Sequence, residues 1–229
     1  MISVKNLLRL KRNSAIAHFG SVTGLLVLLA GVVISLFVQS LASLSLGIML
    51  IGLFLSLIGI YVANRWVKKP RPEDILDREL KGFTNAYRLY HYPDLPYDHI
   101  LLSPFGATII QTVNLEGEFT YQDGKWHEHF NLGRALRYIV EEHLGDPISD
   151  AQESTASLAG HLKEATGSKV PVDGVVLFIH PGAVIEIHKA PVPVLTPKKL
   201  RSIINIKTEK LPEEVYEKVK KYLDQKTHT

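Results

Sequence analysis

The chain has 229 residues, no cysteine and a formal net charge of +3, from 26 basic and 23 acidic residues. The absence of cysteine excludes disulfides, thiolate metal sites and cysteine nucleophiles, so any chemistry must use oxygen and nitrogen groups. Charge is also distributed unevenly, because residues 15–64 contain no Asp, Glu, Lys or Arg and every acidic residue lies beyond them. The sequence therefore predicts two chemically different parts.

The uncharged run is too long for one membrane crossing. A single helix over residues 15–64 would extend about 75 Å, more than twice the hydrocarbon thickness of about 30 Å. A short polar interruption at Gln39, Ser40 and Ser43 divides the run. We therefore expect a hairpin of two transmembrane helices, near residues 17–38 and 41–63.

Basic residues flank this hairpin on both sides and are missing from its turn. The flanking residues are Lys5, Arg9, Lys11 and Arg12 before the first helix and Arg65, Lys68, Lys69 and Arg71 after the second. Because Lys and Arg are retained on the cytoplasmic side, both ends of the hairpin and the domain that follows are expected on the cytoplasmic face of the inner membrane. A cleaved signal peptide fits less well, since the apolar run continues into a second span.

The sequence predicts that the hairpin contacts the lipid bilayer, and a contact with a second copy of the chain is an alternative. Gly20 and Gly24 have the spacing that lets transmembrane helices approach closely, so a homo-oligomer through the hairpin is one interpretation. Such spacings also arise by chance in glycine-rich spans. From Arg65 onward, basic and acidic residues nearly balance, which is not the charge of a strong nucleic-acid binder.

Beyond the hairpin, assigned to residues 1–66, the sequence predicts one compact α/β domain over residues 67–229. Helical periodicity occurs at residues 73–88, 132–143, 147–165, 196–204, where Thr196 is the expected N-cap, and 212–224. Buried strands are expected at residues 98–103, 107–113, 118–121, 174–180 and 183–188. The expected fold is a central mixed sheet flanked by helices, with Ile100, Leu102, Ile109 and Val176 in its core.

One segment resembles a known family. The stretch from Asp77 to Trp126 is similar to the nuclease-related domain (NERD), a branch of the restriction-endonuclease-like PD-(D/E)xK fold. Its central sequence is YDHILLSPFGATIIQTVNLEGEFTYQDGKW. Weaker similarity continues in GDPISDAQ at residues 145–152 and in VPVDGVVLFIHP at residues 170–181. The resemblance covers about 150 residues and implies a metal-dependent phosphodiesterase fold.

The resemblance also implies positions for a catalytic centre. An Asp at the start of one strand and a Glu-x-Lys on the next hold a divalent cation, often helped by an acidic residue of the first helix. Asp98 matches the Asp and Glu79 is the expected helix acid, but Gln111 stands at the Glu position and Val113 at the Lys position. Gln offers Mg²⁺ a neutral oxygen instead of an anionic one, and Val cannot stabilise developing charge.

Two hypotheses about function remain open. In the first, the domain is a catalytically inactive, membrane-anchored module that needs no cofactor and binds a protein partner or nucleic acid. In the second, Glu79, Asp98 and Gln111 still gather Mg²⁺, with Asp98 as the metal ligand, and a lysine from elsewhere replaces Val113. The missing Glu-x-Lys pair and the near-neutral charge favour the first hypothesis.

Other polar residues have a structural interpretation that outweighs a functional one. His127 and His129 could bind a metal, but a solvated loop is favoured because no third ligand lies nearby. His180 and His188 are expected to be hydrogen-bonded histidines at strand ends. Lys198, Lys199 and Arg201 form a basic cluster that could hold a phosphate, yet a solvated face or a helix-dipole contact is favoured.

Overall fold

The computed structural model describes residues 1–129, 143–204 and 209–227, so nearly all of the predicted helix at residues 132–143 lies outside the described residues. The chain divides into two compact units. Among the described residues, one unit, the sheet unit, contains residues 1–7, 72–129, 144–204 and 209–227. The other, the hairpin unit, contains residues 8–71 with His143.

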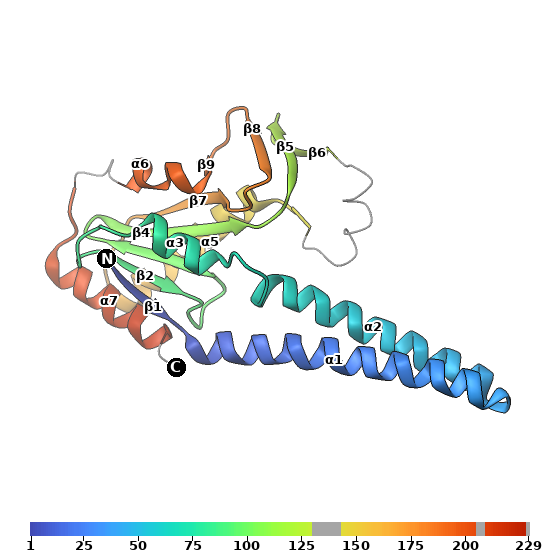
Figure 1. Ribbon diagram of the computed structural model, residues 1–229. Helices are drawn as coiled ribbons and strands as arrows, with labels where there is room; N and C mark the ends of the chain where they lie inside the picture. The colour runs from blue at the N-terminus through green and yellow to red at the C-terminus, as the bar shows by residue number, and fades with distance from the viewer. Residues whose placement is uncertain (130–142, 205–208, 228–229) are drawn as a thin grey trace. The chain divides into compact units, whose positions relative to one another are not determined.

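Two long helices, α1 (Leu7–Phe37) and α2 (Ala42–Trp66), account for nearly all of the described part of the hairpin unit, joined by the short helix η1 (Gln39–Leu41) (Figure 1). Both helices are long and apolar enough to cross a membrane. Large apolar side chains point outward along them, including Phe19 at 71% and Phe37 at 81% exposure. Apolar side chains exposed in this way are typical of helices that face lipid, and the two predicted apolar helices are confirmed.

Small residues line the contact between α1 and α2. Buried positions recur every seven residues on each helix, at Ala17, Gly24 and Gly31 on α1 and at Ser45, Gly52 and Gly59 on α2. A Cβ atom added at Gly24 would overlap the backbone nitrogen of Ser56, so the helices approach to backbone contact. Gly24 thus packs the two helices of one chain, and contact with a second chain stays a prediction.

The sheet unit is built around a six-stranded mixed sheet. Its strands have the order β1-β2-β3-β4-β7-β9, with both parallel and antiparallel neighbours. Their bounds are β1 (Ile2–Lys5), β2 (Arg88–His91), β3 (His99–Ser103), β4 (Gly106–Val113), β7 (Val172–Phe178) and β9 (Val194–Leu195).

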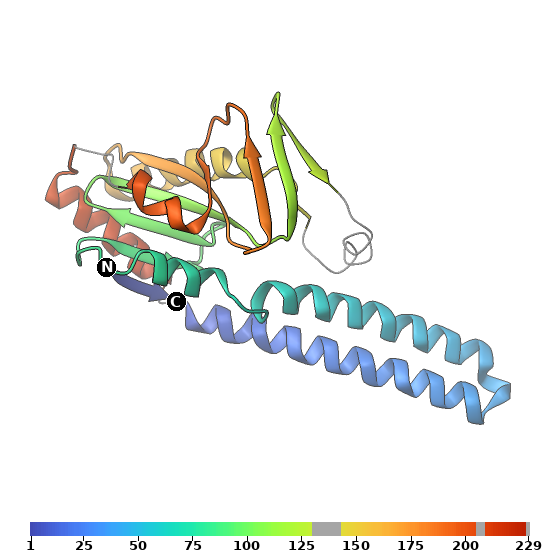
Figure 2. The same ribbon diagram turned by 45° about the horizontal axis from the view of Figure 1, so that its top comes forward.

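Helices cover both faces of this sheet (Figures 1 and 2). One face packs against α5 (Pro147–Thr166) and α7 (Glu213–Thr227), and the other against α3 (Pro72–Glu79) and α6 (Leu200–Ile204), which follows η2 (Pro197–Lys199). Alternate strand residues supply the two cores, so Ile100, Leu102 and Ile109 face α5 and α7. These three and Val176 are at most 1% exposed, which confirms the predicted core.

A second sheet of three strands has the order β6-β5-β8. Its strands are β5 (Gly117–Gln122), β6 (Lys125–His129) and β8 (Ala183–Ile187). Aromatic side chains join it to the larger sheet, since the ring of Phe178 on β7 lies 5.1 Å from that of Phe119 and 5.6 Å from that of Trp126. The segment holding His127 is therefore a strand, whereas the sequence predicted a loop there.

Several elements differ from the prediction. The helix predicted at residues 73–88 ends at Glu79, because the chain turns at Gly82 with a positive φ of 103°, and Arg88 begins strand β2. Thr196 precedes η2 but its side chain makes no capping hydrogen bond. Strands β1, β2, β6 and β9 were not expected, since each has five residues or fewer and lacks clear alternation.

The N-terminal strand β1 belongs to the sheet unit and not to the hairpin unit. The sequence placed residues 1–66 in the hairpin part, but β1 pairs in parallel with β2, from Ile2 beside Arg88 to Lys5 beside His91. The sheet unit therefore receives strands from both sides of the hairpin, and its second segment begins at Pro72. In chain order, the hairpin is inserted between two neighbouring strands of one sheet.

Candidate functional site

Asp98 and Gln111 come together through the pairing of β3 and β4. These strands are antiparallel, with Ile100 opposite Ile109. Continued by two residues, the same register brings Asp98 opposite Gln111. The backbone carbonyl of Asp98 accepts a hydrogen bond from the N–H of Tyr92 at 2.6 Å, which fixes the start of β3.

Glu79 forms its polar contacts with Arg78 and Arg201. It is the last residue of α3, and its carboxylate lies 3.1 Å from Nε of Arg78. No other side-chain contact of Glu79 occurs among the described residues, and its backbone carbonyl accepts a hydrogen bond from Arg201. The acid predicted for the first helix is thus turned toward its own neighbour.

The buried acid of α3 is Glu73, which the sequence analysis missed. Its side chain is 1% exposed, and Tyr92 donates a hydrogen bond to its carboxylate at 2.9 Å. Because the N–H of Tyr92 also binds the carbonyl of Asp98, Tyr92 connects α3 to the start of β3. Tyr92 has a positive φ of 56°, a conformation that costs free energy in a non-glycine residue and that these two contacts maintain.

Next to Glu73 lies a second polar group that the sequence did not predict, here named the Asp77 cluster: Lys5, Asp77, His91 and His99. One carboxylate oxygen of Asp77 lies 2.7 Å from Nζ of Lys5, and the other lies 3.1 Å from Nε2 of His91. Nδ1 of His91 lies 2.9 Å from Nδ1 of His99, and both histidines are 0% exposed. The cluster joins four elements: β1, α3, β2 and β3.

Burial and hydrogen bonding set the protonation of this cluster. Burial raises the pKa of Asp77, but hydrogen bonds from His91, Lys5 and Ser3 outweigh burial and hold that pKa well below its usual range. Burial lowers the pKa of His91, so this ring is neutral. A neutral His91 that donates from Nε2 to Asp77 accepts at Nδ1, and His99 is then the donor in the contact between the rings.

This arrangement predicts that acid destabilises the fold. Below pH 6.5 the unfolded chain protonates His91 while the folded chain resists, so the free energy of unfolding falls by up to about 1.4 kcal/mol per pH unit. Asp77 acts in the same direction below its unfolded pKa of 3.8. Thermal unfolding between pH 7.5 and 5.5 should show this slope, and His91→Gln should reduce it. His188→Gln, at an exposed histidine, is the matched control and should leave this slope unchanged. An unfolding midpoint of the unmodified chain that does not vary with pH would contradict a neutral, buried His91.

The Val113 position is apolar in structure as well as in sequence. Val113 is 7% exposed and packs in the cluster that contains Phe119 and Phe178. Gln111, two residues earlier on the same face of β4, is partly exposed. Within the described residues no group of three or more His, Asp and Glu side chains is arranged to hold a metal ion.

The remaining candidates take structural positions. Nδ1 of His180 accepts the backbone N–H of Gly182 in a turn, and exposed His188 lies 3.1 Å from Glu186. Arg201 donates to the backbone carbonyls of Glu79 and Lys81, beyond the last turn of α3. Such a contact satisfies carbonyls at a helix C-terminus and explains this arginine without a bound phosphate.

Comparison with known families identifies the segment that carries these features. Residues 71–179 match the family model described as the nuclease-related domain (NERD). The chain therefore carries a nuclease-related domain. No curated protein and no solved structure matches the chain. The matched residues include α3, β2 to β6, α5 and β7, so Glu73, Asp77, Asp98 and Gln111 all belong to the nuclease-related domain.

Two parts of the sheet unit lie outside the matched segment. Strand β1 extends the sheet beside β2, and α7 packs on its face. Helix α7 is tied to the sheet by Asp224, which accepts hydrogen bonds from Arg88 at 2.8 Å and from the hydroxyl of Tyr90 at 2.9 Å. The nuclease-related domain is thus completed by chain segments on both sides of it.

Proposed function

We propose that this chain is a membrane-anchored nuclease-related domain that has lost metal-dependent hydrolysis and works as a binding module. The observation that carries the proposal is the pair Gln111 and Val113 on β4. Gln111 stands beside the start of β3 with a neutral oxygen, and Val113 is buried among aromatic side chains. A surviving Mg²⁺-dependent nuclease would need a second anionic ligand and a cation at these positions.

The chemistry of hydrolysis supports this proposal. Mg²⁺ requires nearly octahedral oxygen coordination and is usually held by one or two carboxylates. Asp98 alone would leave the ion mostly coordinated by water. The loss of one electrostatic contact to a transition state typically costs about 3 kcal/mol, which is roughly a hundredfold in rate. The proposal assigns Glu73 a structural role, because its buried carboxylate accepts a hydrogen bond from the hydroxyl of Tyr92.

The membrane part of the proposal rests on chain connectivity and on charge. Strand β1 precedes the hairpin and β2 follows it, yet the two strands pair in one sheet. A folded sheet cannot lie on both sides of a bilayer, so this pairing favours a hairpin whose two ends emerge on the same side. Basic residues at both ends favour the cytoplasmic side of the inner membrane. The bilayer is thus one partner, and a protein or nucleic acid close to the membrane surface is the other.

A nuclease assay on the full chain in detergent micelles tests the loss of hydrolysis. Plasmid DNA, single-stranded DNA and RNA should each remain uncut with Mg²⁺ or Mn²⁺, because the groups that activate water and stabilise charge are missing. An Asp98→Ala variant is the control. Metal-dependent cleavage that disappears in this variant would favour the nuclease hypothesis and contradict the proposal.

A further inference from the structure

Strand β7 has one outer edge that is covered along only part of its length. The direction of each backbone group follows from three hydrogen bonds: Ala107 N–H to the carbonyl of Pro171, Ile179 N–H to that of Val113, and Val176 N–H to that of Pro193. Odd-numbered residues of β7 thus bind β4, and even-numbered residues point outward. The outward groups are those of Val172, Gly174, Val176 and Phe178.

Strand β9 pairs with β7 at Val176 but does not reach Val172 or Gly174. It pairs with β7 at Val176 and Leu177 and has just two residues. The next donor in a parallel ladder would be the N–H of Pro193, which proline lacks. β9 therefore offers no partner to the carbonyl of Gly174. Within the part of the chain that the structure describes, the outward backbone groups of Gly174 and Val172 form a short open edge at the start of β7.

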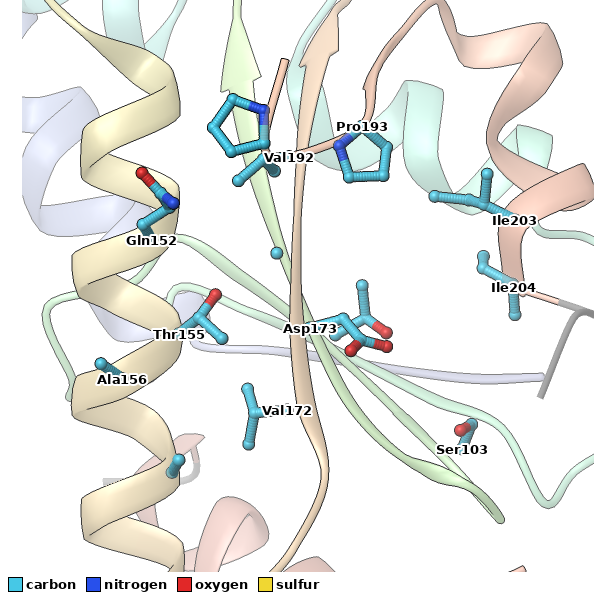
Figure 3. Close-up of a pocket in the computed structure, with 14 residues that line it drawn as sticks. Ser103, Gln152, Thr155, Ala156, Val172, Asp173, Val192, Pro193, Ile203 and Ile204 are labelled. Carbon is cyan, nitrogen blue, oxygen red and sulfur yellow. The ribbon is translucent and has the colours of Figure 1, made fainter. Parts of the chain in front are cut away.

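A cavity of about 650 Å³ lies beside this open edge and is lined by Val172 and Gly174 themselves (Figure 3). Residues of α5 form one wall, including Thr155 and Ala156, and Ile203 and Ile204 form another. Figure 3 shows the side chains of Val172 and Asp173 beside the strand, with α5 on one side and the isoleucines on the other. The cavity therefore combines a strand edge with side-chain space on both faces of the sheet.

The two faces of the cavity differ in chemistry. Val172 contributes to the core on the α5 side, where Ala156 and Ala159 leave room for an apolar side chain. Asp173 points to the opposite face, which is that of α6. Among the lining residues that the structure describes, Asp173 carries the only charge. A strand added here would place alternate side chains against small apolar residues and against a carboxylate.

We propose that this edge binds an extended peptide segment, which adds a strand to β7 and alternates apolar and basic side chains. Its backbone pairs with Val172 and Gly174, its apolar side chains fill the space beside Ala156, and a Lys or Arg reaches Asp173. Backbone pairing at an open strand edge supplies affinity in this binding mode, and the flanking space supplies specificity. The site names a ligand class for the proposed binding module and does not depend on whether the Asp98 region hydrolyses phosphodiesters.

A synthetic peptide of seven residues that alternates valine and lysine is the probe, added to the full chain in neutral detergent micelles. Fluorescence anisotropy measures its affinity. A peptide of the same sequence with N-methylated central amides has the same charge but fewer donors, and should bind at least about tenfold more weakly. Hydrogen exchange in the segment of residues 172–174 should slow when the unmodified peptide binds.

Protein variants locate the site. Ala156→Trp should fill the cavity and weaken peptide binding at least about tenfold, and Asp173→Lys should weaken it through charge repulsion. Gly160→Trp, one turn further along α5 where an added Cβ meets open space, is the matched control and should leave binding unchanged. Equal affinity for the two peptides, no binding of the unmodified peptide, or binding that Ala156→Trp does not alter would overturn the proposal. A chain dimer that Ala156→Trp dissociates would do so too, because a second copy would then occupy the edge.

Discussion

Replacing Gly59 with leucine is expected to force the two transmembrane helices apart. An added Cβ at this position would overlap the backbone nitrogen of Ser21 on the facing helix, and backbone atoms cannot move away as a flexible side chain can. Overpacking of a close contact costs about 1–3 kcal/mol, and leucine adds three further carbons. We expect a loss near the upper end of this range, measured as a lower thermal unfolding midpoint of the full chain in detergent micelles.

Gly47→Leu is the matched control for this experiment. Gly47 lies on the same helix and is exposed, and an added Cβ meets no atom within 4 Å. The same substitution should therefore leave the unfolding midpoint nearly unchanged. Equal destabilisation by the two variants would mean that leucine acts through helix insertion or propensity rather than through the α1–α2 contact.

Replacing Asp77 with alanine is expected to destabilise the sheet unit by about 2–3 kcal/mol, because it leaves two groups without their acceptor. His91 is 0% exposed and would lose the partner of Nε2, while Lys5 would lose its carboxylate at 2.7 Å. The estimate stays below the cost of a fully buried pair, since the side chain of Asp77 is 27% exposed. The expected shift in the unfolding midpoint is about 5–10 °C.

Asp74→Ala on the same helix controls for the loss of a charge. The carboxylate of Asp74 lies 3.9 Å from Lys5, and its side chain is 49% exposed, so this variant should lose less than about 1 kcal/mol. In addition, Lys5→Ala and Asp77→Ala should couple in a double-mutant cycle. Additive effects of these two changes would contradict an ion pair that ties β1 to α3.

The membrane helices and the central strands could be predicted because their signals are local. A run of fifty residues without Asp, Glu, Lys or Arg indicates long apolar helices, and the alternation around Ile100 and Ile109 indicates which side chains enter the core. The family resemblance also came from this contiguous segment. Each of these signals depends on neighbours in the sequence and needs no knowledge of distant contacts.

The strands that the sequence did not predict are stabilised by residues far away in the sequence. β1 has four residues and precedes a membrane helix, so nothing near it in sequence indicates a strand. It forms because β2, more than eighty residues later, offers a parallel edge, and because Lys5 reaches Asp77. The predicted helix at residues 73–88 was longer than α3 for a similar reason. The periodicity of apolar residues does not indicate the positive φ of Gly82, where the chain turns.

The candidate site was predicted in part. Asp98 and Gln111 were matched from the motif, and the strand register supports their proximity. Glu79 was matched to the helix acid that the family resemblance implies, and its position in the site stays a prediction. Glu73 shares a helix face with Leu76 and Leu80, at steps of three and seven residues, and this spacing was the signal that could have identified it as the buried acid. No local pattern marks His91 and His99 as a buried pair, because their contact depends on the register of β2 and β3.

Calorimetric titration of the full chain with Mn²⁺ tests the central claim most directly, because metal binding is required for hydrolysis by any route through Asp98. With one carboxylate and a neutral Gln111 beside it, we predict no saturable binding at submillimolar metal concentration. Gln111→Glu supplies the missing anionic oxygen and is expected to strengthen binding relative to the unmodified chain. Submillimolar Mn²⁺ affinity in the unmodified chain that Asp98→Ala abolishes would contradict the claim that the nuclease-related domain has lost its metal chemistry.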